Sequence, residues 1–245
     1  MLEVLFENEH IIAINKPHGL AVHKSKLVRN TAVFALQLLR DQIGHYVSPI
    51  HRIDRKTSGV LVFSKTQSET AIIQKELQKS QKLYLAIVRG FTPKSGIIQK
   101  ALVNDKGVLQ EAETTYKTIE YSEINIAFGN HSTSRYSLLC IEPSTGRKHQ
   151  IRRHFNHLRH PIIGDRPHGC NKQNRFFLNT WNMNTMLLHA KELAMHNPYS
   201  NQPLRISAPL SSEFKRMLVS LNFKTDLLNL YSKYKSWEEL LNLGK

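Results

Sequence analysis

The sequence has 245 residues, of which 40% are hydrophobic and 22% charged, with 11 glycines and 9 prolines. This composition excludes a disordered or low-complexity chain, and no window approaches the ~18 apolar residues of a membrane-spanning helix. Lysine and arginine number 34 against 19 aspartates and glutamates, a formal net charge of +15, which favours a polyanionic partner such as a nucleic acid over a merely basic soluble protein.

The two cysteines, Cys140 and Cys170, are too few for a disulfide framework and form no C-x-x-C motif. The N-terminal MLEVLFENEH has no basic segment followed by an apolar run, so no signal peptide is predicted. We therefore expect a cytoplasmic protein without membrane contact. No linker or shift in composition divides the chain, and we expect one domain over residues 1–245, acting as a monomer.

Strand-like segments recur with helical ones along the chain, which predicts a mixed α+β fold. In QKLYLAIVRG (81–90), Leu83, Leu85 and Ile87 alternate with Tyr84, Ala86 and Val88, so this strand has two usable faces. The expected strands lie at residues 11–15, 59–63, 81–90, 112–121, 134–142, 185–195 and 203–207.

Helices are expected between these strands. One runs over residues 31–43 with Gly44 as its C-cap, and the next runs to about residue 79 from a capping box of Thr66 and Glu69. The tail from Ser211 onward is expected to form two further helices.

The densest positive charge lies between residues 147 and 175, with eight lysines or arginines against a single acid, Asp165. The segment GRKHQIRRHFNHLRH predicts a helix from about Lys148 to His160, with Ile151, Phe155 and Leu158 as its buried stripe. On the neighbouring stripe, Arg152 and Arg159 are expected to face nucleic-acid phosphates. The alternative is an ordinary solvated basic face.

The same segment holds four histidines, at positions 149, 154, 157 and 160, but their spacing matches no H-E-x-x-H motif. Cationic neighbours would repel a divalent ion, so no metal site is expected. The sequence also has no P-loop, G-x-G-x-x-G or G-x-S-x-G motif, which removes the usual support for a nucleotide-dependent enzyme or an esterase.

A different kind of cluster lies in SPIHRIDRKTSGVLVFSKT (48–66), where Asp54 is the only acid and stands among Arg52, Arg55 and Lys56. This positive field favours the ionised carboxylate, which can act as a nucleophile or a general base. The alternative is an ordinary aspartate in a loop salt bridge, and the local sequence alone favours this alternative.

Five segments in order along the chain resemble motifs of the RluA-type pseudouridine synthases. HRIDRKTSG (51–59) is similar to the signature H-R-L-D-x-x-T-S-G, with isoleucine in place of leucine. The other four are NKPHGLAVH (15–23), QKLYLAIVRG (81–90), TGRKHQIRRH (145–154) and LLHA (187–190). Little can be aligned between residues 97 and 130 or beyond about residue 209.

The resemblance implies a pseudouridine synthase fold, with a central, largely antiparallel mixed sheet, flanking helices and an RNA-binding cleft. It also implies conversion of uridine to pseudouridine in RNA without metal or cofactor. Asp54 is then the nucleophile, Tyr84 stacks on the base, and Arg152 pairs with Asp54. The residues expected to bind the substrate are His51, Arg52, Leu188, Arg147, His149 and Arg159.

Within the family, the segment RRHFNHLRHPIIGDRPHG (152–169) resembles members that modify uridine 65 in the T stem of tRNA, including His168 where most relatives carry tyrosine. As in those members, no small N-terminal RNA-binding domain is expected. We therefore expect tRNA to be the partner and position 65 the target. The alternatives are a synthase acting on rRNA and a non-catalytic RNA-binding protein with the same fold.

Overall fold

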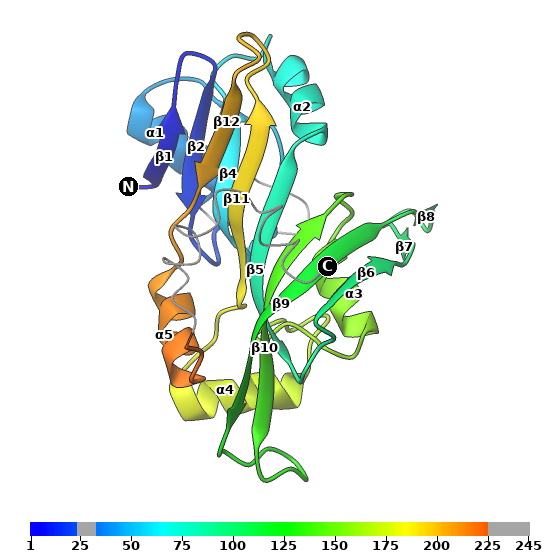
Figure 1. The fold of residues 1–245 in the computed structure, drawn as a ribbon. Coiled ribbons are helices and arrows are strands. Elements are labelled where there is room, and N and C mark those ends of the chain that lie inside the picture. The colour runs from blue at the N-terminus through cyan, green and yellow to red at the C-terminus, as the bar shows by residue number, and fades with distance from the viewer. Residues whose placement is uncertain (24–32, 225–245) are drawn as a thin grey trace.

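A single sheet organises the molecule (Figure 1). The computed structural model describes residues 1–23 and 33–224, and ten of the strands within them form this sheet. Across it, the order is β1 (Glu3–Glu7), β2 (Ile11–Lys16), β4 (Ser58–Ser64), β11 (Leu188–His196), β5 (Gln81–Arg89), β10 (Ser134–Pro143), β9 (Glu113–Ile124) and β6 (Ser95–Gln99), while β12 (Pro203–Ser207) pairs with β11 and β3 (Ser48–Pro49) with β4. Among these pairs only β4 and β11 run parallel.

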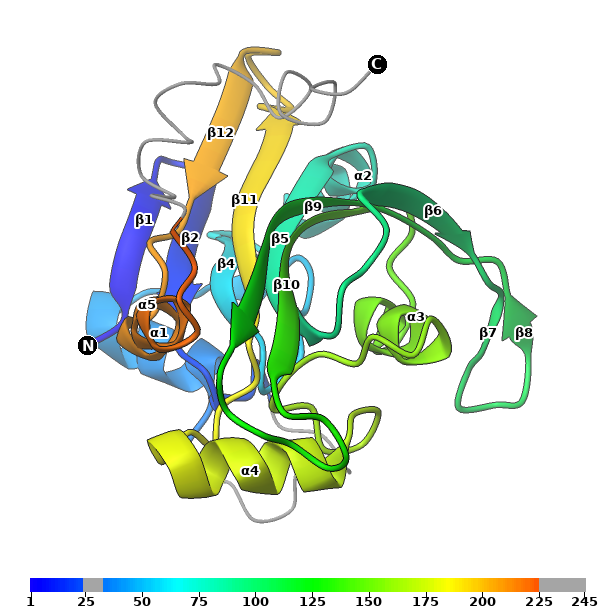
Figure 2. The ribbon, with the colours of Figure 1, turned by 60° about the horizontal axis from the view of Figure 1, so that its bottom comes forward.

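Helices cover both faces of the sheet, which confirms the expected α+β fold. They are α1 (Ala35–Ile43), α2 (Thr70–Gln78), α3 (Gln150–His157), α4 (Asn171–Trp181) and α5 (Ser212–Ser220). Figure 2 shows β9 and β6 curving around α3, and a separate hairpin of β7 (Leu102–Val103) and β8 (Leu109–Gln110) continues from that end. The curved part of the sheet therefore encloses α3 on its concave side.

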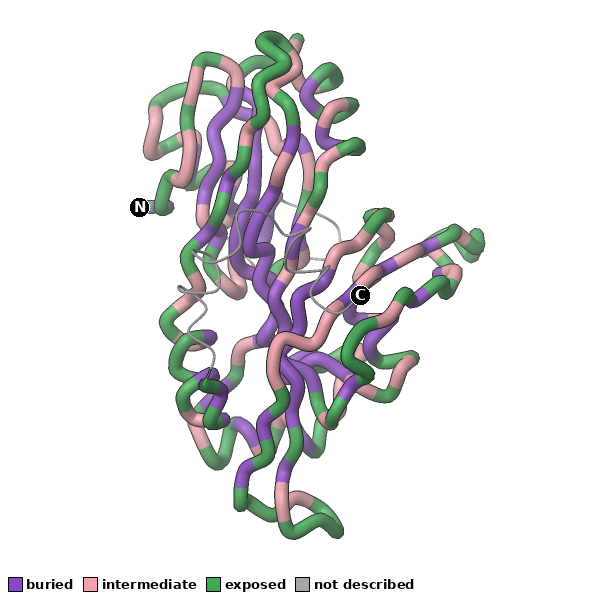
Figure 3. Tube along the Cα trace, viewed as in Figure 1, coloured by how far each residue is buried: buried purple, intermediate pink, exposed green. Residues whose placement is uncertain are grey.

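The alternation predicted for residues 81–90 is confirmed, and it connects two separate cores. Leu85 and Ile87 pack with α4 and α5, whereas Ala86 and Val88 pack with Ile151 and other residues around α3. All of these side chains are buried, and Figure 3 shows buried residues concentrated along the middle of the sheet. Because β5 is covered on both faces, it is a rigid support for any side chain that it presents.

The sequence predicted most of the long strands but misplaced some helix ends. Thr66 and Glu69 do form a hydrogen bond, 2.6 Å between Thr66 Oγ1 and Glu69 Oε2, but the helix begins only at Thr70. Residues 31 and 32 of the first expected helix and the second helix expected after Ser211 lie outside the described residues. The expected elements lack the short strands β1, β3, β6, β7 and β8, which have two to five residues each. They also lack helix α4, which lies within the basic residues 147–175.

Helix α3 begins at Gln150 rather than at Lys148. The residue before it, His149, adopts a left-handed backbone conformation with φ of 55°. This conformation is incompatible with a right-handed α-helix, so α3 cannot include His149. Non-glycine residues seldom adopt this conformation, and it is often found at functional sites. The break turns the chain sharply just before α3 and sets the direction of the His149 side chain.

Residues 50–57, which connect β3 to β4 and carry Asp54, form the Asp54 loop. Just after this loop, Gly59 allows β11 to approach β4 closely. Its φ is +109°, and a Cβ added there would lie 2.1 Å from the carbonyl oxygen of Ala190. The two strands pair in parallel through His189 with Ser58 and Ala190 with Gly59. A side chain at position 59 would therefore separate the two strands that flank the candidate site.

We predict that Gly59→Ala lowers the free energy of unfolding by about 3 kcal/mol, because it adds a backbone clash to the strain of a positive φ. Gly107→Ala is the matched control, since Gly107 has φ of +79° but no atom within 4 Å of an added Cβ. It should cost only about 1 kcal/mol. Urea unfolding of both variants measures the difference, and equal losses would show that the close approach of the strands is unimportant.

Candidate active site

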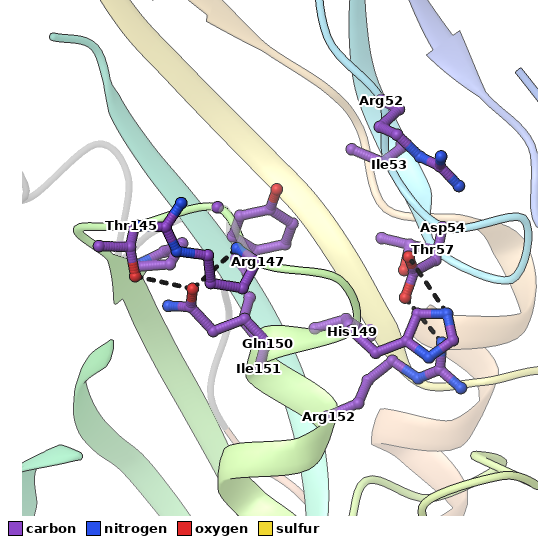
Figure 4. A pocket seen from close by; sticks show the side chains of 14 residues that line it. Arg52, Ile53, Asp54, Thr57, Thr145, Arg147, His149, Gln150, Ile151 and Arg152 are labelled. Atoms are coloured by element: carbon purple, nitrogen blue, oxygen red, sulfur yellow. Dashed lines mark hydrogen bonds and ion pairs between the residues drawn. The ribbon is translucent and has the colours of Figure 1, made fainter. Parts of the chain in front are cut away.

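A pocket lies where the Asp54 loop, strands β5 and β11 and the start of α3 meet, and Figure 4 shows its side chains. Its volume of about 110 Å³ is well below the roughly 300–1,000 Å³ of sites for drug-sized ligands, so it suits one ring rather than a large cofactor. The described residues that line it are Arg52, Ile53, Asp54, Thr57, Tyr84, Pro143, Thr145, Gly146, Arg147, His149, Gln150, Ile151, Arg152 and Leu188. Asp54 is the only carboxylate among them.

The centre of this site is a chain of three charges. Arg152 Nη1 lies 2.7 Å from Asp54 Oδ2, while its Nη2 and Nε lie 2.8 and 2.9 Å from the two carboxylate oxygens of Asp165. Exposure falls inward, from 22% of the Asp54 side chain to 5% for Arg152 and 0% for Asp165. Arg152 thus holds Asp54 from behind and is itself held by a bidentate pair with a buried carboxylate.

This arrangement corrects the expectation that Arg152 faces RNA phosphates alongside Arg159. Arg152 is 4% exposed, because α3 packs against the sheet on one side and against the Asp54 and Asp165 loops on another. Burial opposes the charge of Arg152, but its hydrogen bonds to Asp165 and Asp54 outweigh burial and raise its pKa above the usual value. Arg159 follows the helix, is exposed, and adopts φ of 62°.

The Asp54 loop is fastened to the segment KPHGL (16–20). The buried ammonium group of Lys16 donates hydrogen bonds to the carbonyl oxygens of Pro17, Leu20 and Arg55, at 2.8 to 3.1 Å. Burial lowers the pKa of Lys16 to about 7, although the nearby charge of Asp54 opposes this shift. Gly19 also exchanges backbone and side-chain hydrogen bonds with Arg55. These contacts hold the loop immediately after Asp54.

Tyr84 and Leu188 form the walls of the pocket on the sheet side. They project from the neighbouring strands β5 and β11, where Tyr84 pairs with Ala190 and Leu188 pairs with Ala86. Leu188 is buried, and Tyr84 is half-buried. Burial, together with the negative charge of Asp54, raises the pKa of the Tyr84 hydroxyl, which is therefore protonated at neutral pH. A planar ring entering the pocket would meet one aromatic and one aliphatic surface.

Of the other five predicted site residues, three line the pocket and two do not. Arg52 lines the pocket and is exposed, and Arg147 lines it with its Nε donating to the carbonyl oxygen of Glu111, at 2.9 Å. His149 also lines it, with Nε2 at 3.9 Å from Asp54 Oδ1. His51 is not among the lining residues, because its Nε2 accepts a hydrogen bond from the backbone N–H of Val62. Arg159 also lies outside the lining.

The pairing of Asp165 with Arg152 is not predicted from the sequence, in which Asp165 stands out only as the single acid among residues 147–175. Its being the only carboxylate in a strongly basic segment was the available signal, because such an acid is expected to have a specific cationic partner. Asn174 of α4 braces this part of the chain, since its side chain donates to the carbonyl oxygen of Asp165 and accepts from the N–H of Gly164. The unpredicted helix α4 therefore helps to hold the backbone of Asp165 in place.

Within residues 1–23 and 33–224, no group of three or more histidine, cysteine, aspartate or glutamate side chains is placed to hold a metal ion. None of the helices in that part of the chain has the length and apolar character needed to cross a membrane. Cys140 and Cys170 are free thiols.

We predict that Asp165→Asn lowers the free energy of unfolding by about 3 kcal/mol, because Arg152 would keep its charge and lose a buried anionic partner. The control is Asp105→Asn, which removes the exposed partner of Lys148 and should leave the unfolding midpoint unchanged. Thermal and urea unfolding followed by circular dichroism would measure both. If the two variants behave alike, the pair with Asp165 does not stabilise the fold.

Comparison with known proteins agrees with this geometry. Residues 10–157 match the family described as RNA pseudouridylate synthase. A relative from Vibrio parahaemolyticus, tRNA pseudouridine synthase C, is 39% identical over 93% of this chain and 98% of its own length. A Haemophilus ducreyi relative of the same name is 40% identical over 88% of this chain and 94% of its own length.

Solved structures resemble the fold as well. Human RNA pseudouridylate synthase domain containing 4 superposes with a TM-score of 0.69 at 21% identity, covering 89% of this chain and 92% of that one. Human RNA pseudouridylate synthase domain containing 1 gives 0.65 at 19% identity, covering 92% and 96%. The length of the family match and the identity to these bacterial relatives show that the protein belongs to the RNA pseudouridylate synthase family.

Proposed function

We propose that the protein is an isomerase that converts uridine to pseudouridine in tRNA. The observation that carries this proposal is the Asp54 carboxylate, which enters the pocket with Arg152 behind it at 2.7 Å and Tyr84 and Leu188 beside it. The tRNA substrate is supported by relatives named tRNA pseudouridine synthase C, which are 39% identical over 93% of the chain.

The reaction breaks the N1–C1′ bond of a uridine, turns the base, and joins C5 to C1′, while C5 loses a proton and N1 gains one. Atoms and electrons balance without an oxidant, a reductant or a hydrolytic water, so the chemistry needs no cofactor. We assign Asp54 as the nucleophile, attacking either C6 of the base or C1′ of the ribose. Arg152 donates a hydrogen bond to this carboxylate and holds it directed into the pocket.

The target uridine must leave its stack before it can turn, and the pocket fits a flipped base. Tyr84 offers a ring on which the base can stack, and Leu188 provides an apolar floor. The largely protonated Tyr84 hydroxyl is also available for proton transfer. His149 and Arg147 line the pocket, where they can contact the ribose and phosphates of a flipped nucleotide, and we assign them, with Arg52, to substrate binding.

Outside the pocket, exposed cations provide contacts for RNA phosphates. In the Asp54 loop and in residues 147–175, the exposed cations outside the pocket lining are Arg55, Lys148, Arg159, Arg166, Lys172 and Arg175. Arginine and lysine on the surface neutralise phosphates and release counterions, so affinity for tRNA should fall as salt rises. We keep Arg159 in this role. We do not assign His51 a contact with RNA, because its ring accepts a hydrogen bond from the backbone N–H of Val62 in β4.

We further propose that the target is uridine 65 of tRNA. This is supported by the resemblance of residues 152–169 to members of the family that modify that position. Position 65 lies at the base of the T stem next to the acceptor stem, so a basic surface beside the pocket can follow phosphates across the junction. We propose a single domain acting as a monomer, and the cytoplasmic location stays a prediction from sequence.

The experiment is position-resolved detection of pseudouridine after incubating the purified protein with a full-length tRNA transcript. A minihelix of the acceptor and T stems is the second substrate, and the controls are a transcript with cytidine at 65, an anticodon stem-loop and an rRNA fragment. We expect pseudouridine at 65 in the first two RNAs only.

Asp54→Asn should abolish turnover while tRNA binding stays within a few-fold, because phosphate contacts lie elsewhere.

Each failure identifies a different error. Modification of the rRNA fragment with tRNA unmodified would replace the substrate and leave the chemistry intact. Pseudouridine at another tRNA position would overturn position 65. Turnover by pure Asp54→Asn protein would remove Asp54 as the nucleophile, and tRNA binding without any pseudouridine would support a non-catalytic RNA-binding protein.

A further inference from the structure

Two histidines lie in direct contact beside Asp54. His149 Nδ1 is 2.8 Å from His168 Nε2, and the two rings meet edge to face with centroids 5.0 Å apart. The opposite nitrogen of His149, Nε2, points toward Asp54 and lies 3.9 Å from its Oδ1. Arg152 occupies the other carboxylate oxygen, Oδ2. The chain His168–His149–Asp54 therefore ends on the oxygen that Arg152 leaves free.

The backbone holds both rings in this arrangement. His149 has φ of 55°, so its side chain is aimed by a sharp turn rather than by the helix that follows. His168 donates its backbone N–H to Asp165 Oδ1 at 3.3 Å. Gly169 follows in a turn where an added Cβ would lie 2.0 Å from the carbonyl oxygen of Asp165. The carboxylate that anchors Arg152 thus also anchors His168.

Both rings are neutral near pH 7. Burial is the largest cause that lowers the pKa of His149 and of His168, and the charge of Arg152 lowers both further. The negative charge of Asp54 opposes the shift at both rings, and that of Asp165 opposes it at His168, but the pKa of each ring stays below its usual value. The charged and titratable groups that face the pair are Asp54, Asp105, Asp165, Arg152, Arg153 and Lys148. Two neutral imidazoles in contact share one hydrogen, and either ring can donate it.

The two possible positions of this hydrogen place different groups of His149 opposite Asp54. If His149 donates from Nδ1, the lone pair of its Nε2 faces the carboxylate, and the two repel. If His168 donates from Nε2, His149 carries its hydrogen on Nε2 and presents an N–H to Asp54. The negative charge on Asp54 favours the second arrangement.

We propose that His168 is a positioning residue that fixes His149 in the tautomer with hydrogen on Nε2, so that this N–H faces Asp54. His149 then orients the free oxygen of the carboxylate from one side while Arg152 holds the other oxygen. The effect on catalysis rests on the proposed function, because it requires Asp54 to be the reacting group. The tautomer itself does not depend on that function.

Nitrogen-15 NMR of the protein labelled in histidine tests the tautomer directly, since protonated and unprotonated ring nitrogens have distinct shifts. We expect Nε2 of His149 to be protonated and Nδ1 to be unprotonated in the wild-type protein at neutral pH. Hydrogen on Nδ1 instead would overturn the proposal. This measurement needs only the wild-type protein, and so it decides the question even if a variant does not fold.

Two variants of similar size separate donation from packing. His168→Gln keeps an N–H donor, whereas His168→Met does not. With the Met variant we expect a mixture of His149 tautomers. We also expect kcat to fall by roughly tenfold, which corresponds to about 1.4 kcal/mol and to the loss of one hydrogen bond. Affinity for tRNA should change less than twofold, and the Gln variant should recover most of kcat. His131→Met, an exposed histidine elsewhere, is the control and should change nothing.

An unchanged tautomer and kcat in His168→Met would refute the positioning role. Equal losses in the Gln and Met variants would also refute it, since packing alone would then account for the effect. Neither result touches the proposed function, which fails only through the tests on Asp54 and tRNA.

Discussion

A guanidinium group held between two carboxylates is the interaction on which the rest of this site depends. Arg152 binds the buried Asp165 with two hydrogen bonds and extends a third to Asp54 at the pocket. Removing an ion from water is costly, and the surrounding partners must compensate for it. Asp165 therefore balances Arg152 in the interior, and Asp54 stays partly exposed at the pocket. The arrangement orients Asp54, and it makes the fold sensitive to the loss of either partner of the buried pair.

The fold supplies the parts of this arrangement from distant segments. The Asp54 loop is fastened by Lys16 and leads into β4, which lies against β11 because Gly59 has no side chain. Strand β5, buried on both faces, presents Tyr84. The broken start of α3 at His149 brings Arg152 beneath the pocket, and α4 braces the Asp165 turn through Asn174. Each support is a packing or hydrogen-bonding constraint that leaves the carboxylate in one position.

The sequence predicted the alternating strands and the contact between Asp54 and Arg152, although these residues are 98 positions apart. The strands follow from periodicity, and the contact follows from ordered motifs rather than from periodicity. Helical spacing correctly placed Ile151 and Phe155 inside, but it also placed Arg152 on an RNA-facing stripe. A single amphipathic pattern cannot show that a helix is covered on two sides. Asp165, the His149 backbone and the His168 contact depend on loop geometry, which local sequence does not reveal.

If Asp54 is the nucleophile, as proposed, the planar geometry of Arg152 matters for activity as well as its charge. The most direct measurement is the single-turnover rate of pseudouridine formation by Arg152→Lys protein on saturating tRNA. Lysine keeps the positive charge but cannot span two carboxylates with a planar group, so the rate should fall by roughly 100-fold, about 2.7 kcal/mol, with unchanged tRNA affinity. A rate near that of the wild-type protein would contradict the account, because charge alone would then be enough to hold Asp54.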